Sequence, residues 1–252
     1  MSDIKDFFRP INPNMGIDEK AYEQLQVCVS AIDAVARSTN KSMYIIDYNR
    51  KNFLYVSSNP LFLCGYTPEQ VQEMGYLFYE QTISEEEMQM LQEINTSGFS
   101  LYYRQEKEER LDMTIQYDFH LQYTNGKKIL INHKLTPILL NENGDIWLAL
   151  CVVSLSSRTT PGNVILEKKN APAHYAYSFE SKHWKEVPNI TLSERETDIL
   201  RLSAQGYANN DIGEHLFIDA NTVKFHKKNI FQKLEAENIT EAIGIATNLR
   251  LI

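Results

Sequence analysis

The sequence is short of cysteine and of long apolar runs. Its three cysteines, Cys28, Cys64 and Cys151, lie far apart without a CxxC pair, which argues against a disulfide framework or a zinc ribbon and predicts small, reduced side chains. The longest apolar run, IWLALCVV at 146–153, is too short to cross a bilayer, and no basic-then-apolar leader precedes the first domain. We therefore expect a cytoplasmic protein with no membrane partner.

Catalytic and cofactor motifs are missing as well. The sequence contains no glycine-rich phosphate loop, HExxH pair or elbow serine, and its histidines form no triad by spacing. His120 has no second ligand at useful spacing, and Cys64 lacks the surrounding motif of flavin-binding light sensors. The acidic residues 85–87 are interpreted as a solvated first helical turn. We predict that the protein is not an enzyme, and the sequence gives no support for haem, flavin or metal.

Positive charge is also scarce, with 25 Lys and Arg against 33 Asp and Glu and a net charge of -8. A chain of this balance is not a general polyanion binder, so any contact with nucleic acid requires a local basic patch. Residues 222–234, TVKFHKKNIFQKL, form such a patch, because every charge in them is positive. The length of 252 residues favours two domains.

The first segment, residues 1–40, is irregular to about residue 17 and then has a helical pattern to about residue 37. Apolar residues in this helix alternate by steps of three and four, the spacing of a short coiled-coil seam. Either this seam pairs two subunits or it packs on the chain's own next domain, and the sequence leaves both interpretations open. The candidates for dimerisation here are Tyr22, Leu25, Val29 and Ile32.

Residues 41–156 are expected to form two strands, then a group of helices, then three strands. MYIID and NFLYVS predict two short strands, and Thr67, Pro68 and Gln70 mark the capped start of a helix. A second helix is expected from Ser84. The strict alternation in TIQYDFHLQY predicts a half-buried strand, TNGK a hairpin turn, and IWLALCVVS a central strand covered on both faces.

This order of elements, together with the stretch YIIDYNRKNFLYVSSNPLFLCGYTPEQVQEMG, resembles the PAS sensor family. The resemblance implies an antiparallel five-stranded sheet with flanking helices. A connector at 157–190 follows, opening with SSRTTPGN. We expect it to contain short strands and a small aromatic hairpin that docks on a neighbouring domain, built from Tyr175, Tyr177, Phe179 and Trp184.

Residues 191–252 have the pattern of a helix-turn-helix domain. Ser193 and Glu196 form a capping box, and Gly206 is placed to end the first helix. A second helix is expected at about 209–216, and Asp219 has the chemistry of an N-cap for a third. Two short helices joined by a tight turn are typical of this motif.

Helical spacing divides the third helix into two faces. One face is apolar and carries Val223, Ile230 and Leu234. The other carries Asn221, Lys224, Phe225, Lys228 and Gln232. Residues 188–252 hold seven Lys or Arg against nine Asp or Glu, a net of -2, yet residues 221–234 hold four lysines and no acid. The positive charge of this domain is concentrated on one helix.

The segment resembles the LuxR-type helix-turn-helix of bacterial transcription regulators over about 60 residues. The matching residues are Leu192, Arg195, Glu196, Leu200, Gly206, Ile212, Leu216, Thr222, Val223, Lys224, His226, Ile230, Lys233, Leu234, Glu241 and Ala242. The chain departs from the family pattern at Gly213, where alanine is usual, at Glu235, where glycine often ends the helix, and at Ile239, where a basic residue is common.

The resemblance implies a four-helix domain whose third helix enters the major groove of double-stranded DNA. The side chains expected to face bases are Lys224, Phe225, Lys228 and Asn221, since lysine suits guanine N7 and O6 and an aromatic ring suits a thymine methyl. Those expected to face phosphates are Thr222, Lys227, Lys233 and His226, although packing is an equal alternative for His226. The closing helix, from Thr240, is expected to contact a second subunit through Ala242, Ala246 and Leu249.

These observations predict an α+β protein that acts as a sequence-specific transcription regulator. The expected partners are DNA and a second copy of the chain, with a small-molecule ligand for the PAS-like domain and RNA polymerase as possible further ones. The sequence names no ligand-binding residues. One alternative is a PAS-like domain that serves only for dimerisation or protein docking. Another is a ligand-binding or catalytic protein whose carboxyl-terminal helices merely pack.

Overall fold

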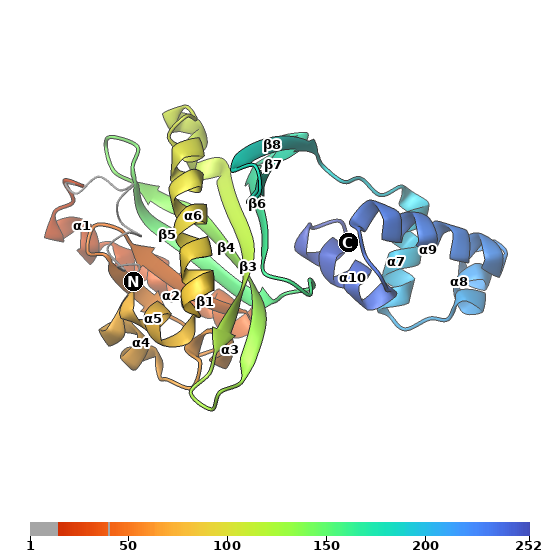
Figure 1. Ribbon diagram of the computed structural model, residues 1–252, viewed down its shortest axis with the longest axis horizontal. Helices are drawn as coiled ribbons and strands as arrows, with labels where there is room; N and C mark the ends of the chain where they lie inside the picture. The colour runs from red at the N-terminus through yellow and green to blue at the C-terminus, as the bar shows by residue number, and fades with distance from the viewer. Residues whose placement is uncertain (1–14, 40) are drawn as a thin grey trace. The chain divides into compact units, whose positions relative to one another are not determined.

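The computed structural model describes residues 15–39 and 41–252 (Figure 1). The irregular stretch predicted before residue 15 lies outside the described residues. The chain divides into two compact units. The first, called the PAS-like unit after the resemblance predicted from its sequence, comprises residues 1–155 and 159–187, and the second, called the helix-turn-helix unit, comprises residues 156–158 and 188–252. Most of the predicted connector therefore belongs to the first unit.

The described part of the PAS-like unit begins with two helices, α1 (Glu19–Glu23) and α2 (Leu25–Thr39). Leu25 is buried, and Tyr22, Val29 and Ile32 pack against the core of the same unit. The Tyr22 hydroxyl also accepts hydrogen bonds from Asn49 Nδ2 at 3.1 Å and from Trp147 Nε1 at 3.3 Å. The four residues considered for dimerisation thus contact their own unit, and a further role in pairing two subunits stays a prediction for the half-buried Tyr22, Val29 and Ile32.

The sheet is antiparallel, in the order β2-β1-β5-β4-β3-β6-β7-β8. Its strands are β1 (Ser42–Asp47), β2 (Asn52–Val56), β3 (Met113–Gln122), β4 (Lys128–Leu140), β5 (Ile146–Leu155), β6 (Gly162–Lys168), β7 (Ala173–Ser178) and β8 (His183–Pro188). The sheet contains the five expected strands, β1 to β5, and three more, because β6 pairs with the open edge of β3 and extends it. This pairing satisfies backbone groups that an edge strand leaves exposed.

The helical part of the unit lies between β2 and β3. It consists of α3 (Pro60–Leu63), α4 (Pro68–Met74), α5 (Leu77–Thr82), α6 (Glu85–Tyr102) and the 3-10 helix η2 (Lys107–Asp112). The predicted starts are confirmed: Thr67 and Gln70 form both hydrogen bonds of a capping box, and the Ser84 side chain caps α6. The long helix α6 lies along one face of the sheet (Figure 1).

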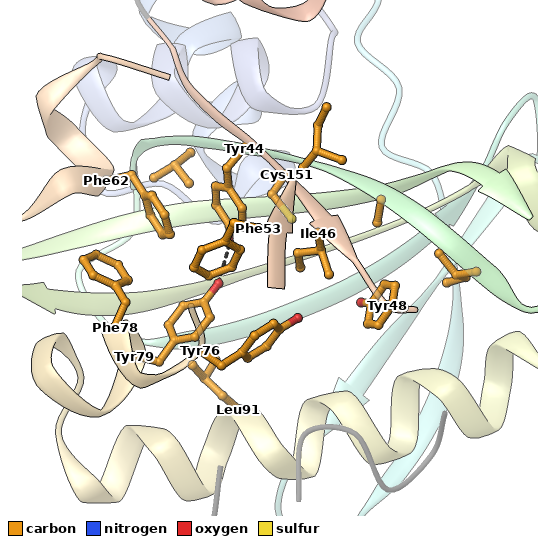
Figure 2. Packing of buried hydrophobic residues seen from close by; sticks show 14 of the residues in the cluster. Tyr44, Ile46, Tyr48, Phe53, Phe62, Tyr76, Phe78, Tyr79, Leu91 and Cys151 are labelled. Atoms are coloured by element: carbon orange, nitrogen blue, oxygen red, sulfur yellow. Dashed lines mark hydrogen bonds between the residues drawn. The ribbon is translucent and has the colours of Figure 1, made fainter. Parts of the chain in front are cut away.

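Aromatic side chains fill the core between the short helices and the sheet (Figure 2). Tyr44 stacks on Phe62, with ring centres 4.1 Å apart. Its hydroxyl lies 2.5 Å from the Tyr79 hydroxyl and 2.6 Å from His133 Nε2, so three buried polar groups form a chain inside an apolar cluster. Burial lowers the pKa of His133 to about 3, and the imidazole is therefore neutral near pH 7.

We expect Tyr44→Phe to destabilise the PAS-like unit by roughly 1–3 kcal/mol, because it leaves two buried hydrogen-bonding groups without their shared partner. Both tryptophans, Trp147 and Trp184, lie in this unit, so tryptophan fluorescence during urea unfolding measures the effect. Tyr66→Phe is the control, since this half-buried ring stands outside the chain of polar groups. Equal stability of the two variants would contradict the prediction.

The connector hairpin, defined as β7 and β8, packs on α6. The Tyr177 hydroxyl donates to Glu93 Oε1 at 2.9 Å, and Trp184 Nε1 donates to the backbone oxygen of Ser97 at 3.3 Å. Tyr177 and Trp184 also touch each other, with ring centres 5.1 Å apart. The predicted aromatic hairpin therefore exists, and the surface on which it docks is a helix of its own unit.

The helix-turn-helix unit has four helices, as expected: α7 (Glu194–Ala204), α8 (Asn209–Leu216), α9 (Ala220–Leu234) and α10 (Ile239–Asn248). Its core contains Ile199, Leu200, Ile212, Val223, Ile230, Leu234 and Ala242, all fully buried. Across the part of the chain that the structure describes, no helix is long and apolar enough to span a membrane.

Candidate nucleic-acid interface

The turn between α8 and α9 sets the position of the third helix of the domain. Asp219 caps α9, its side chain accepting from the Asn221 backbone N–H at 2.6 Å. The preceding turn is tight, since the Ile218 N–H donates to the Gly213 oxygen at 2.9 Å. A Cβ atom on Gly213 would lie only 2.6 Å from the Ile218 oxygen. Glycine costs roughly 1 kcal/mol of helix propensity here, but it allows this close approach.

The two faces of α9 are separated as predicted. Val223, Ile230 and Leu234 are fully buried in the domain core. The residues predicted to face bases are all exposed on the other side: Asn221, Lys224, Phe225 and Lys228. Phe225 is 60% exposed, which is unusual for so large an apolar ring and leaves it free to contact a base methyl. The spacing of three and four residues between Asn221, Lys224, Phe225 and Lys228 places these side chains along one stripe of the helix.

The residues predicted to face phosphates have less uniform surroundings. Thr222, His226 and Lys227 are half-buried at the edge of the exposed stripe. Burial lowers the pKa of Lys227. The His226 ring meets the Phe225 ring edge-on, with ring centres 5.8 Å apart. Both the packing and the phosphate interpretations of His226 stay predictions.

Lys233 has a partner that the sequence reasoning missed. Its ammonium lies 2.7 Å from Glu196 Oε2 and donates to the Thr191 oxygen at 3.3 Å. Glu196 is only 4% exposed and also accepts from the Ser193 N–H at 2.8 Å, within the confirmed capping box. Burial opposes ionisation of Glu196, but the hydrogen bonds from Lys233 and Ser193 outweigh it and lower its pKa. Lys233 thus joins the end of α9 to the start of α7, and its phosphate role stays a prediction.

We expect Lys233→Met to destabilise the helix-turn-helix unit by roughly 1–3 kcal/mol, because it leaves a buried carboxylate without its cation. In a Glu196→Gln background the same change should cost much less, since no charge is then left unpaired. Hydrogen exchange of the buried Ile199 and Leu200 amides, without DNA, measures both values. Equal costs in the two backgrounds would rule out the ion pair as the cause. The contribution of the Glu196–Lys233 pair to the free energy of unfolding should decrease as the pH falls below 4.5, the ordinary pKa of the carboxyl group.

Two of the three dimerisation candidates of the closing helix are buried in their own domain, whereas Leu249 is half-buried and its role in pairing stays a prediction. Ala242 and Ala246 are fully buried, and Leu249 packs against the same core. Small side chains here bring α10 close to the other helices, and they offer no surface to a second chain. Ile239, which replaces a common basic residue, packs on this core too. Glu235 ends α9 with a φ of 52°, a conformation that costs a non-glycine residue about 1 kcal/mol.

The other residues considered for chemistry have ordinary partners. His120 Nδ1 lies 2.7 Å from Glu87 Oε1, and the His120 backbone N–H donates to Glu87 Oε2 at 2.6 Å. The interpretation of residues 85–87 as solvated is therefore wrong for Glu87, although Glu85 and Glu86 are exposed. Burial raises the pKa of the Cys64 thiol to about 12, which leaves it unreactive near pH 7. Among the described residues, no three His, Cys, Asp or Glu side chains are placed to hold a metal ion.

The carboxyl-terminal unit is a four-helix helix-turn-helix domain of the kind found in bacterial regulators. Residues 190–246 match the family described as "Bacterial regulatory proteins, luxR family", and the unit is a LuxR-type helix-turn-helix. The transcriptional regulatory protein LiaR of Bacillus subtilis is 42% identical over 66 residues, which are 26% of this chain and 31% of that protein. The oxygen regulatory protein NreC of Staphylococcus haemolyticus is 43% identical over 65 residues, 26% of this chain and 30% of that protein. The chain thus spans about a third of the length of these curated relatives.

Two solved structures have low similarity to this chain. The Vibrio cholerae VqmA dimer, described as a LuxR-type receptor in the absence of its target DNA, is 15% identical, covers 91% of this chain and 88% of that one, and has a TM-score of 0.30. The PAS domain of a protein from Colwellia psychrerythraea is 14% identical, covers 52% of this chain and 96% of that one, and has a TM-score of 0.37.

Proposed function

We propose that the protein is a cytoplasmic, sequence-specific transcription regulator that binds double-stranded DNA through α9. The observation that carries the proposal is the stripe of Asn221, Lys224, Phe225 and Lys228, exposed on a helix whose opposite face is locked into a LuxR-type core. Lysines on such a stripe can donate to guanine, and the phenyl ring suits a thymine methyl. A helix of this length fits the major groove.

In this proposal the PAS-like unit controls the output of the helix-turn-helix. A ligand or partner shifts a dimer of the chain between two arrangements, and only one of them matches two half-sites on DNA. Contact of the DNA-bound dimer with RNA polymerase would complete the regulatory step. The size of the response is limited by how differently the ligand binds the two arrangements.

Selection of binding sites from random duplex DNA tests the proposal with the full chain. We expect a single motif with two half-sites to emerge, and mass measurement of the complex should give two chains per duplex. Failure to enrich any motif would contradict sequence-specific binding. Enrichment of one half-site by a single chain would contradict the dimer and leave DNA recognition intact.

A second candidate role, in which the PAS-like unit is only a docking platform, is favoured by one observation. Val27 and Val35 of α2 are 79% and 48% exposed and lie two helical turns apart on one face, an apolar stripe open to a partner. The double variant Val27→Lys, Val35→Lys should then no longer self-associate in sedimentation. If the PAS-like unit is instead only a sensor, the same variant should keep the assembly state of the unaltered chain.

A further inference from the structure

The turn between α8 and α9 presents a phenyl ring to solvent. Phe217 is 95% exposed, more than any other large apolar side chain in the described part of the chain. Its backbone has a φ of 55° and a ψ of 46°, the left-handed conformation that glycine or asparagine adopts at less cost. The ring gains almost no burial, and the backbone favours a different residue. The fold of the unit therefore does not explain a phenylalanine at this position.

The residues around this ring in the sequence are acidic. Residues 209–219, which contain α8 and the turn, hold three acids and no Lys or Arg. These acids, Asp211, Glu214 and Asp219, are all exposed. Phe217 is the C-cap of α8, where the helix dipole adds a negative partial charge. The acidic turn surface, defined as these three acids and Phe217, thus combines negative charge with one exposed ring.

The charge of the acidic turn surface argues against DNA as its partner. Residues 221–234 hold four lysines and no acid, so two neighbouring segments of the unit carry opposite charges. Phosphates are attracted to the lysines of α9 and repelled by the acids of the turn. A protein surface with basic side chains and an apolar slot is the complementary partner, because opposite charges orient such a contact and an aromatic anchor gives it affinity.

The proposed DNA-bound state of the chain indicates which protein this is. A neighbour on the same duplex carries basic surfaces, because it too must neutralise phosphates. For a transcription regulator, that neighbour is RNA polymerase. The acidic turn surface shares no residue with the stripe of Asn221, Lys224, Phe225 and Lys228, so the chain can use one set of side chains for DNA and the other for a protein.

We infer that the acidic turn surface is a docking site for RNA polymerase, in which the Phe217 ring enters an apolar slot and the three acids meet basic side chains of the polymerase. The inference rests on the proposed function for the identity of the partner. The contact itself requires no DNA, so docking and DNA recognition are measured separately.

Titration of the fluorescently labelled full chain with bacterial RNA polymerase holoenzyme, without DNA, tests the inference by anisotropy. We expect Phe217→Asn to weaken binding by about tenfold, because it removes the anchoring ring. Asparagine suits the left-handed backbone, so hydrogen exchange of the buried Ile199 and Leu200 amides should be as slow as in the unaltered chain, or slower. Phe225→Asn is the matched control, since it removes an exposed ring from α9 and should leave polymerase binding unchanged.

Glu214→Lys tests the charge of the surface. It should weaken polymerase binding by about fivefold and make that binding less dependent on salt, because an attraction becomes a repulsion. Glu237→Lys makes the same change of charge at an exposed position outside the acidic turn surface and should leave the affinity unchanged. Equal losses in the two lysine variants would show that only the net charge of the chain matters, and would overturn the site.

Absence of binding between the unaltered chain and the polymerase would overturn the inference, as would equal affinities of the unaltered chain and Phe217→Asn. Faster amide exchange in Phe217→Asn would also overturn it, because the ring would then support the fold. Binding of random duplex DNA should be the same in Phe217→Asn and the unaltered chain, and a loss there would show that the ring meets DNA instead.

The proposed function fails by a separate route, because selection of DNA sites is carried out without polymerase. A chain that enriches no DNA motif, yet loses polymerase binding on Phe217→Asn and Glu214→Lys, would contradict sequence-specific DNA binding and leave the docking site in place. A chain that enriches a motif and binds polymerase equally well in all variants would keep DNA recognition and exclude this surface.

Discussion

Lowering the pH from 7 to 4 should destabilise the PAS-like unit by roughly 3 kcal/mol through His133 alone. Burial lowers the pKa of this imidazole from 6.5 to about 3, so in this range the unfolded chain binds a proton and the folded unit does not. The unfolded state is therefore favoured increasingly as the pH falls below 6.5, and the loss ends near pH 3. The physical cause is the cost of placing a charge among the buried rings of Tyr44, Tyr117 and Phe119.

Urea unfolding followed by tryptophan fluorescence at several pH values measures this slope. His133→Gln should remove most of it, because glutamine does not titrate and can still bond the Tyr44 hydroxyl. His183→Gln is the matched control, since His183 is exposed at the start of β8. Asp47 acts in the opposite direction, because burial raises its pKa and protonation then favours the folded state. An unchanged slope in His133→Gln would refute the assignment.

Lys224→Ala and Lys228→Ala should each weaken binding to the selected DNA motif by roughly 1–3 kcal/mol, about 5- to 150-fold in Kd. Both lysines are exposed on the α9 stripe and away from the core. If they contact bases, each substitution also relaxes the preference at one position of the motif. Affinity for random DNA should change much less, because phosphate contacts made elsewhere remain.

Lys227→Ala and Lys185→Ala are the comparisons for this experiment. Loss of a phosphate contact at Lys227 should weaken all sequences alike and lower the dependence of binding on salt. Lys185 is exposed on β8, outside the helix-turn-helix unit, and its substitution should change nothing. Equal losses on specific and random DNA for Lys224→Ala and Lys228→Ala would show that these side chains carry no sequence information.

Most element starts were predictable from short-range chemistry. Capping depends on a side chain and a backbone group three residues apart, so Thr67, Ser84, Ser193 and Asp219 were each identified from the sequence and confirmed. The two faces of α9 were predictable for the same reason, because helical periodicity places a residue's neighbours by spacing alone.

Contacts between residues far apart in the sequence were harder to predict. The pair of Glu196 and Lys233 joins residues 37 positions apart, and nothing in the local pattern distinguishes a lysine that meets a carboxylate from one that meets a phosphate. The seam from Tyr22 to Ile32 raised the same difficulty, since its spacing describes an apolar face and leaves open what covers it. Ala242 and Ala246 fit a helix interface with a second chain or with their own domain equally well.

The sequence by itself determined where the helices begin, that the last four form a LuxR-type domain, and which side of α9 carries its lysines. Those features follow from interactions within a few residues and from a motif with many matched positions. Only the tertiary structure decided that β6 extends the sheet, that the hairpin rests on α6, and that His133 is buried against Tyr44 and Tyr117. Each of these depends on contacts between distant segments, which are set by the packing of the whole unit.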